Sequence, residues 1–117
     1  MNIYWSRCAR DRNLGDQLGP LLLRHYVPNL AVTWAAPTDA AVVACGSVID
    51  ALPDGWAGTV INAGTLRATT RRCLAGPILS LRGRATARLV DAHAGVVLGD
   101  LGVLAPRLLD ERPPVEY

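Results

Sequence analysis
Short apolar runs alternate with segments of helical spacing along most of the chain, and this alternation is the strongest pattern in the sequence. Residues 15–26 carry apolar side chains at helical spacing, which predicts a helix that ends before Pro28 and has Pro20 near its first turn. Residues 40–45 form a continuous apolar run, which is typical of a strand buried on both faces. We predict strands at 2–5, 31–35, 40–45, 59–62, 78–81 and 96–98, and helical segments at 15–26, 48–52, 65–74, 84–93 and 103–109.

This order of elements determines the expected fold class. Strands that alternate with helical crossovers form parallel sheets that are covered on both sides. We therefore expect an α/β fold: a doubly wound, mostly parallel Rossmann-like sheet with helices on both faces. The domain is expected to cover residues 1–110, and residues 111–117, which include Pro113 and Pro114, are expected to be a tail or an interdomain linker.

The composition of the chain excludes several classes of function. The chain has 117 residues, half of them hydrophobic, which is enough for one core. Its net charge of +2 gives no strong field for nucleic acid or an anionic membrane, so neither partner is expected. All twelve basic residues are arginine, which excludes a Schiff-base lysine and the lysine of a phosphate-binding P-loop.

The cysteines and the amino terminus point to a compartment. Cys8, Cys45 and Cys73 are far apart and form no CxxC pair, so neither a zinc site nor a disulfide framework is expected. Cys45 is expected to be a buried core thiol. The sequence begins directly with a predicted strand, without a signal-peptide pattern, and no stretch reaches the roughly 18 apolar residues that span a bilayer. We expect a cytoplasmic protein with no transmembrane segment, no metal and no cofactor.

Small or charged residues follow four of the predicted strands. Open parallel sheets bind ligands beyond the carboxyl ends of their strands. Here those ends carry Gly46–Ser47, Gly64–Thr65, Arg82–Gly83 and Gly99–Asp100. We predict that these four pairs lie along one rim of the sheet and that the rim binds a ligand.

The first candidate segment joins the first strand to the first helix. Gly15 permits a tight turn or a close ligand approach, and free N–H groups at a helix start favour an anion. Asn13 and Asp16 flank this glycine. Asp16 fits two roles, a helix cap or a ligand for a sugar hydroxyl.

Two further candidates follow later strands. Arg82, at a strand end and before a helix, suits recognition of a phosphate or carboxylate. A structural salt bridge to Asp16 or Asp100 is an equal alternative. Asp100 lies between Gly99 and Gly102, where it either binds a hydroxyl, orients Arg82, or forms an Asx-type turn at the start of the last helix.

Other polar and aromatic residues fit structural roles better. The arginines within residues 67–72 are expected on a solvated helix face. His25 and His93 are expected to interact with helix C-termini, not to form a metal pair. The tryptophans are expected in core or turn packing: Trp5, Trp34 and Trp56.

Five segments, taken in order, resemble the polysaccharide pyruvyltransferase family. They are the Asn-x-Gly-Asp-x-Leu-x-Pro-like segment at 13–20, the small-residue strand ending in Gly-Ser at 42–47, the strand ending in glycine at 60–64, the Arg-Gly-x-x-Thr element with its helix at 82–89, and the Leu-Gly-Asp turn at 98–104. Arg84 and Leu101 stand where proline is common in the family.

The resemblance implies a function and a set of binding residues. It implies the N-terminal domain of a two-domain, GT-B-like protein that transfers a pyruvyl group from phosphoenolpyruvate to a sugar of a cell-surface polysaccharide. The basic residues for phosphoenolpyruvate and the catalytic acid are expected in a C-terminal half, supplied by a partner domain or chain or by a homo-oligomer, so no catalytic residue is assigned here. The alternative is a non-catalytic sugar- or nucleotide-sugar-binding module, or a truncated remnant subunit. The expected substrate-binding residues are Asn13, Gly15, Asp16, Gly46, Ser47, Gly64, Arg82, Gly83, Gly99 and Asp100.

Overall fold

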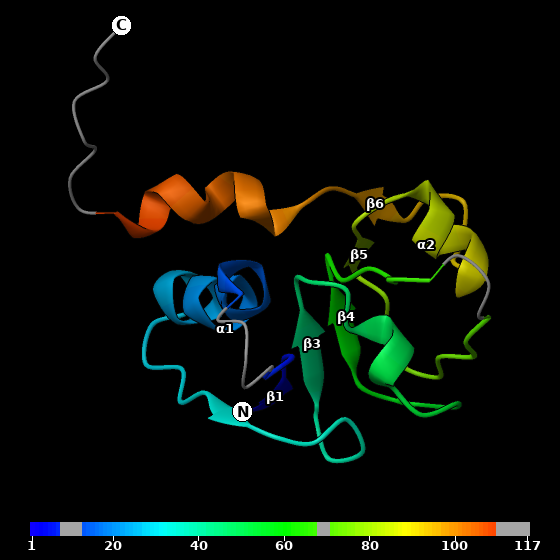
Figure 1. Cartoon of the computed structure of the whole chain (residues 1–117), viewed down its shortest axis with the longest axis horizontal. Coiled ribbons are helices and arrows are strands. Elements are labelled where there is room, and N and C mark those ends of the chain that lie inside the picture. Colours follow the sequence, from blue (N-terminus) through cyan, green and yellow to red (C-terminus); the bar gives the residue numbers. More distant parts are fainter. Residues whose placement is uncertain (8–12, 68–70, 110–117) are drawn as a thin grey trace, which may run out of the picture.

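A parallel sheet lies at the centre of the protein (Figure 1). The structure is a computed structural model that describes residues 1–7, 13–67 and 71–109. The four main strands of the sheet pair in the order β2-β1-β3-β4, and every pair is parallel. Ile3 stands opposite both Trp34 and Val42, which places β1 between β2 and β3. These strands are β1 (Asn2–Tyr4), β2 (Thr33–Trp34), β3 (Val42–Ala44) and β4 (Thr59–Ile61).

Two further strands form a second, two-stranded sheet that isolated bridges join to the β4 side of the first. β5 (Ser80–Leu81) and β6 (Val97–Leu98) form a parallel pair. Parallel bridges join Ala63 to Leu81 and Val60 to Ile78, and the amide of Arg82 donates to the carbonyl of Ala63 at 3.0 Å. The strands therefore follow one another across the molecule as β2-β1-β3-β4-β5-β6, and the predicted α/β fold with a parallel sheet is confirmed.

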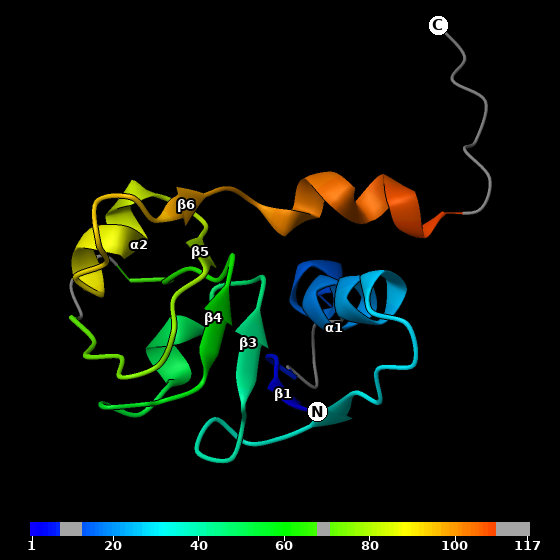
Figure 2. The same cartoon turned by 180° about the vertical axis from the view of Figure 1, so that it is seen from behind.

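One group of helices packs beside β3. α1 (Leu14–Tyr26) contacts the 3-10 helix η2 (Leu101–Leu108), and Figures 1 and 2 show them one above the other. Their apolar cluster is built around Leu18, Leu22 and Cys45. Gly19 allows the close approach, because a Cβ there would lie 1.9 Å from the carbonyl oxygen of Ala44.

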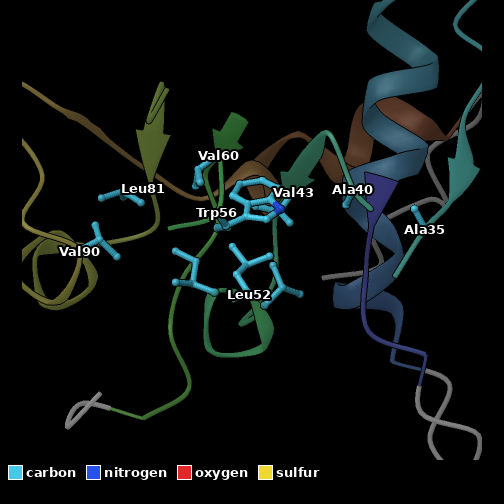
Figure 3. Close-up of a cluster of buried hydrophobic side chains, with 11 residues drawn as sticks. Ala35, Ala40, Val43, Leu52, Trp56, Val60, Leu81 and Val90 are labelled. Atoms are coloured by element: carbon cyan, nitrogen blue, oxygen red, sulfur yellow. The ribbon is translucent and has the colours of Figure 1, made fainter. Parts of the chain in front are cut away.

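A second apolar cluster contains the other side chains of the sheet. Figure 3 shows the buried indole of Trp56 near Val43 and Val60, and this confirms the expected packing role of that tryptophan. Val43 and Ala44 are successive residues of β3, so their side chains point to opposite faces of the sheet. The cluster is completed by residues of the 3-10 helix η1 (Ile49–Ala51) and by Val90, which follows α2 (Arg84–Leu89).

Three local predictions were wrong: the position of Pro20 within its helix, the end of the helix predicted over 84–93, and the helix predicted over 65–74. α1 begins at Leu14, so Pro20 is its seventh residue and lies beyond the first turn. There its ring nitrogen cannot make the helical hydrogen bond. The helix predicted over 84–93 ends at Leu89, because Asp91 adopts a left-handed conformation with φ of 50° and turns the chain.

The helix predicted over 65–74 is absent from the described parts of that range, 65–67 and 71–74. The backbone there bonds to distant parts of the chain. The amide of Arg72 donates to the carbonyl of Leu89 at 3.0 Å, and the amide of Cys73 donates to Oδ1 of Asp54 at 2.8 Å. Because these long-range partners take the N–H groups, a helical ladder does not form.

The remaining predictions concern membrane-spanning helices, metal sites, the cysteines and the chain termini. Within the described ranges, no helix is long and apolar enough to cross a membrane, and no group of three or more His, Cys, Asp or Glu side chains is placed to hold a metal ion. Cys45 is buried, as predicted, and Cys73 is exposed. The predicted tail at 111–117, Cys8 and most of the loop before α1 lie outside the described residues.

Candidate functional site
The carboxyl ends of the strands lie along one edge of the sheet because all the strands are parallel. In Figure 1 the arrows of β3 and β4 point towards the segment that links β6 to η2. Gly46 and Ser47 follow β3, Gly64 follows β4, Arg82 follows β5 and Asp100 follows β6. The predicted residues at the four strand ends therefore do share an edge.

The start of α1 lies at the same edge. Asn13 is the N-cap, and its side-chain oxygen accepts from the amide of Gly15 at 2.9 Å. Asp16 is therefore not the cap, which was one of its two predicted roles. Its carboxylate lies against Gly46 instead, since a Cβ on Gly46 would be 3.1 Å from Oδ1 of Asp16. Gly46 has a φ of 76°, which an L side chain rarely adopts.

Arg82 lies over the backbone of the neighbouring strand end. Its guanidinium donates from Nη2 to the carbonyl oxygen of Thr65 at 3.1 Å. Among the described residues it forms no ion pair, so the structural salt bridge to Asp16 or Asp100, one of the predicted alternatives, is absent. Gly83 is the N-cap of α2 and has open space around it.

A small cavity of about 320 Å³ lies beside this guanidinium. Thr86, which follows Arg82 in the Arg-Gly-x-x-Thr element, is buried and accepts from the amide of Thr65 at 3.2 Å. Arg82 and Thr86 thus hold the same residue of the β4 loop from two sides. Arg82 and Thr86 both line the cavity.

Asp100 has the role of a cap. Its Oδ1 accepts from the amide of Gly102 at 2.8 Å and so caps η2. The Asx-type turn that was one reading of this aspartate is therefore formed. The carbonyl of the preceding Gly99 accepts from Nδ2 of Asn62 at 2.6 Å.

The thiol of Cys45 is influenced by the charges of Arg82, Asp100 and Asp16. Burial raises the pKa of its thiol; the N–H of Gly46 and the charge of Arg82 oppose this shift, and the carboxylates of Asp100 and Asp16 add to it. Four of the predicted residues thus act on one buried sulfur. A thiol with a raised pKa is a poor nucleophile, so Cys45 is a packing residue of the edge.

Asn62 is a residue of this edge that the sequence did not single out. It adopts a left-handed conformation with φ of 48° directly after β4, and its amide donates to Oγ of Ser80 at 3.0 Å. Oγ of Ser80 in turn donates to Oδ1 of Asn62 at 2.9 Å. Asn62 therefore ties the ends of β4, β5 and β6 together. The available signal was an asparagine directly after an apolar run, since asparagine tolerates positive φ.

A larger hollow of about 390 Å³ lies where β1 and β3 end. Tyr4 and Ser6 line it from the β1 side, and burial, together with the charge of Asp16, raises the pKa of the Tyr4 phenol. Ser47 is the one predicted site residue on its wall. The other polar wall residues, Asp50, Arg67 and Arg72, were not predicted as site residues.

Arg72 departs from the prediction of solvated arginines, whereas Arg67 and Arg71 are exposed as predicted. Arg72 is half-buried, and its Nη2 donates to the carbonyl oxygen of Asp50 at 2.8 Å. Asp50 and Arg72 are 22 positions apart in the sequence, so no local pattern could have paired them.

No family model, no curated protein and no solved structure matches the chain. The chemistry of the sheet edge is therefore the basis for assigning a function.

Proposed function
We propose that the chain is a doubly wound, Rossmann-like N-terminal domain of a polysaccharide pyruvyltransferase-like protein with GT-B-like architecture. In this proposal it binds the sugar acceptor at the carboxyl edge of its sheet. A C-terminal half completes the cleft and supplies the catalytic acid, and phosphoenolpyruvate is the pyruvyl donor. Phosphoenolpyruvate is made inside the cell, so the reaction belongs to the cytoplasm.

One observation carries the proposal. Arg82 extends over Gly64 at the carboxyl edge without a carboxylate partner among the described residues. A cation fixed beside a cavity and not neutralised by the protein is suited to an acidic group of a ligand. Asp16 and Gly46, from two other segments of the resemblance, lie at the same edge.

The two departures from the family pattern fit the geometry. Arg84 and Leu101 stand where proline is common, and each is the first residue of a helix, after the N-caps Gly83 and Asp100. Proline is favoured at the first helical position because the N–H there has no helical partner. Both N-caps are extended, with ψ of 172° and 120°, so neither is in the α region that proline disfavours in the residue before it. Both turns are therefore compatible with proline at the next position.

The residues have distinct proposed roles. Arg82 binds an acidic group of the acceptor or of the transferring pyruvyl moiety. Asp16 accepts from a sugar hydroxyl, and Gly46 and Gly64 leave room beside the backbone for the side chains of Asp16 and Arg82. Ketal formation also needs a general acid and the exclusion of water. The C-terminal half supplies both.

Exposed apolar side chains provide a surface for that half. Val97 on β6 is 64% exposed and Val103 on η2 is 78% exposed, while Leu109 follows η2 and is 58% exposed. They belong to the segment that passes the carboxyl edge. A domain or second chain seated there would close the cleft over the edge.

A non-catalytic sugar-binding module is the second candidate. It applies where no C-terminal half supplies the acid, because both histidines lie away from the edge: His25 is at the far end of α1 from Asp16, and His93 lies beyond α2. Neither is positioned by the described edge as a general acid. A binding module would keep the sugar site and lack turnover.

Disruption of the gene in the source cells separates the two candidates. The readout is the pyruvate that mild acid releases from the purified surface polysaccharide. We expect this ketal pyruvate to disappear on disruption, to return with the wild-type gene and with Arg107→Gln, and not to return with Arg82→Gln. An unchanged pyruvate content after disruption would refute pyruvyl transfer and leave the binding module.

A further inference from the structure
The hollow between β1 and β3 lies at the reversal point of the sheet. The chain passes from β1 to β2 on one side, and β3 then pairs with the other side of β1. Ligands of open parallel sheets bind outside the carboxyl ends at such a point. A volume of about 390 Å³ is within the range of small-molecule sites and near its lower end.

The charge of its wall favours an anion. Arg67 and Arg72 supply two guanidinium groups and Asp50 supplies one carboxylate, so the balance is positive. The planar guanidinium of arginine matches a phosphate in a bidentate arrangement. Ser6 and Ser47 add two hydroxyl groups, which both donate and accept.

Asp50 and Arg72 are held in place by the backbone. Oδ2 of Asp50 accepts from the amide of Leu66, and Nη2 of Arg72 donates to the carbonyl oxygen of Asp50. Within the described part of the chain, Oδ1 of Asp50 and Nε of Arg72 are buried and have no hydrogen-bond partner. Leaving buried charged groups unsatisfied costs stability. A ligand hydroxyl would donate to Oδ1 of Asp50, and a phosphate oxygen would accept from Nε of Arg72.

We propose that this hollow binds a small phosphorylated polyol of the sugar-phosphate class. Arg67 and Arg72 hold the phosphate, and Asp50 and Ser47 bind hydroxyl groups. The inference goes beyond the proposed function and does not depend on it, because none of the three charged wall residues belongs to the five segments of the resemblance. It also differs in place from the Arg82 cavity, with which it shares only Leu66.

Isothermal titration calorimetry tests the site with three probes: α-glucose 1-phosphate, inorganic phosphate and glucose. We expect glucose 1-phosphate to bind, phosphate to bind more weakly, and glucose to give no signal at millimolar concentration. Binding of phosphate as tightly as glucose 1-phosphate would overturn the polyol part of the proposal. Absence of binding by both phosphorylated probes would overturn the whole.

Substitutions of residues that line the hollow test whether the phosphorylated probes bind there. Arg67 is exposed, so Arg67→Gln should fold, as circular dichroism would check, and it should weaken glucose 1-phosphate binding by about tenfold or more, the loss of one charge-assisted contact. Asp50→Asn should weaken glucose 1-phosphate and leave phosphate unchanged or improved. Arg107→Gln, at an exposed arginine of η2, is the matched control and should bind as the wild type does.

Arg82→Gln separates this inference from the proposed function. It should leave glucose 1-phosphate binding unchanged while abolishing polysaccharide pyruvylation. If Arg82→Gln removes the binding and Arg67→Gln does not, the anion sits in the Arg82 cavity and this inference is wrong. The role given to Arg82 would then stand.

Discussion
The guanidinium of Arg82 occupies the place where a side chain of residue 64 would stand: a Cβ added to Gly64 would lie 2.6 Å from Nε of Arg82. Two residues 18 positions apart in the sequence thereby determine where the guanidinium of Arg82 lies at the edge. The absence of a side chain at Gly64 leaves space for the guanidinium of Arg82, which donates a hydrogen bond to the carbonyl of Thr65 beside that glycine.

Gly64→Ala should therefore displace Arg82. We expect a loss of about 0.5–1.5 kcal/mol in the free energy of unfolding, because the displaced guanidinium loses its hydrogen bond to the carbonyl of Thr65, measured by urea denaturation. Acceptor binding should weaken together with stability. Gly83→Ser is the control, because nothing lies within 4 Å of a Cβ there and serine is a good N-cap. Equal stability of the two variants would contradict the close contact.

Gly46 and Gly55 form a matched pair for the role of Asp16. Both have a φ of 76°, but only Gly46 has Asp16 beside it. Alanine at either position should cost about 1–2 kcal/mol, because both backbones are left-handed. Only Gly46→Ala should also weaken acceptor binding, measured by calorimetry. Unchanged binding by Gly46→Ala would remove Asp16 from the sugar site.

The thiol of Cys45 should make the fold sensitive to alkali. Burial raises its pKa in the folded state, so as the pH rises above about 8 the unfolded chain loses the proton while the folded chain retains it. The unfolded state then binds fewer protons, and the free energy of unfolding falls as the pH rises. The raised pKa of the Tyr4 phenol extends this fall to higher pH.

Urea denaturation across this pH range, repeated on two cysteine variants, checks the assignment. Cys45→Ala should flatten the decline. Cys73→Ala removes an exposed thiol and should leave the slope unchanged. A wild-type slope in Cys45→Ala would show that another group is responsible.

Proline at residue 84 should be accepted. Arg84 is exposed and is the first residue of α2, so Arg84→Pro removes no helical hydrogen bond and should leave stability unchanged or raise it by about 0.4–1 kcal/mol. Arg88→Pro, within the same helix, should cost about 3 kcal/mol. Thermal unfolding distinguishes them. A comparable loss in both variants would mean that α2 starts earlier than Arg84.

Local patterns in the sequence predicted most elements of the fold. The helix ending before Pro28 and the apolar strand β3 follow directly from spacing and from apolar runs, because these signals depend only on neighbours. The helix predicted over 65–74 failed because its amides bond to Asp54 and Leu89, which no local pattern reveals.

The candidate site shows the same division. Parallel strands bring their carboxyl ends together, so the positions of Gly46, Gly64 and Arg82 at one edge could be predicted. The pairing of Asp50 with Arg72, across 22 positions, depends on how η1 and the chain after residue 70 fold back on one another. Single-residue contacts of this kind arise only from the tertiary structure.

Amide chemical shifts test most directly whether the carboxyl edge is the ligand-binding edge. The ¹⁵N-labelled chain would be titrated with repeat-unit oligosaccharide released from the surface polysaccharide of the source cells. The account predicts shifts concentrated at the amides of Gly46, Gly64 and Gly83, with Asn2 and Ala41 at the opposite ends of their strands unaffected. Shifts confined to that opposite edge, or none at saturating oligosaccharide, would contradict it.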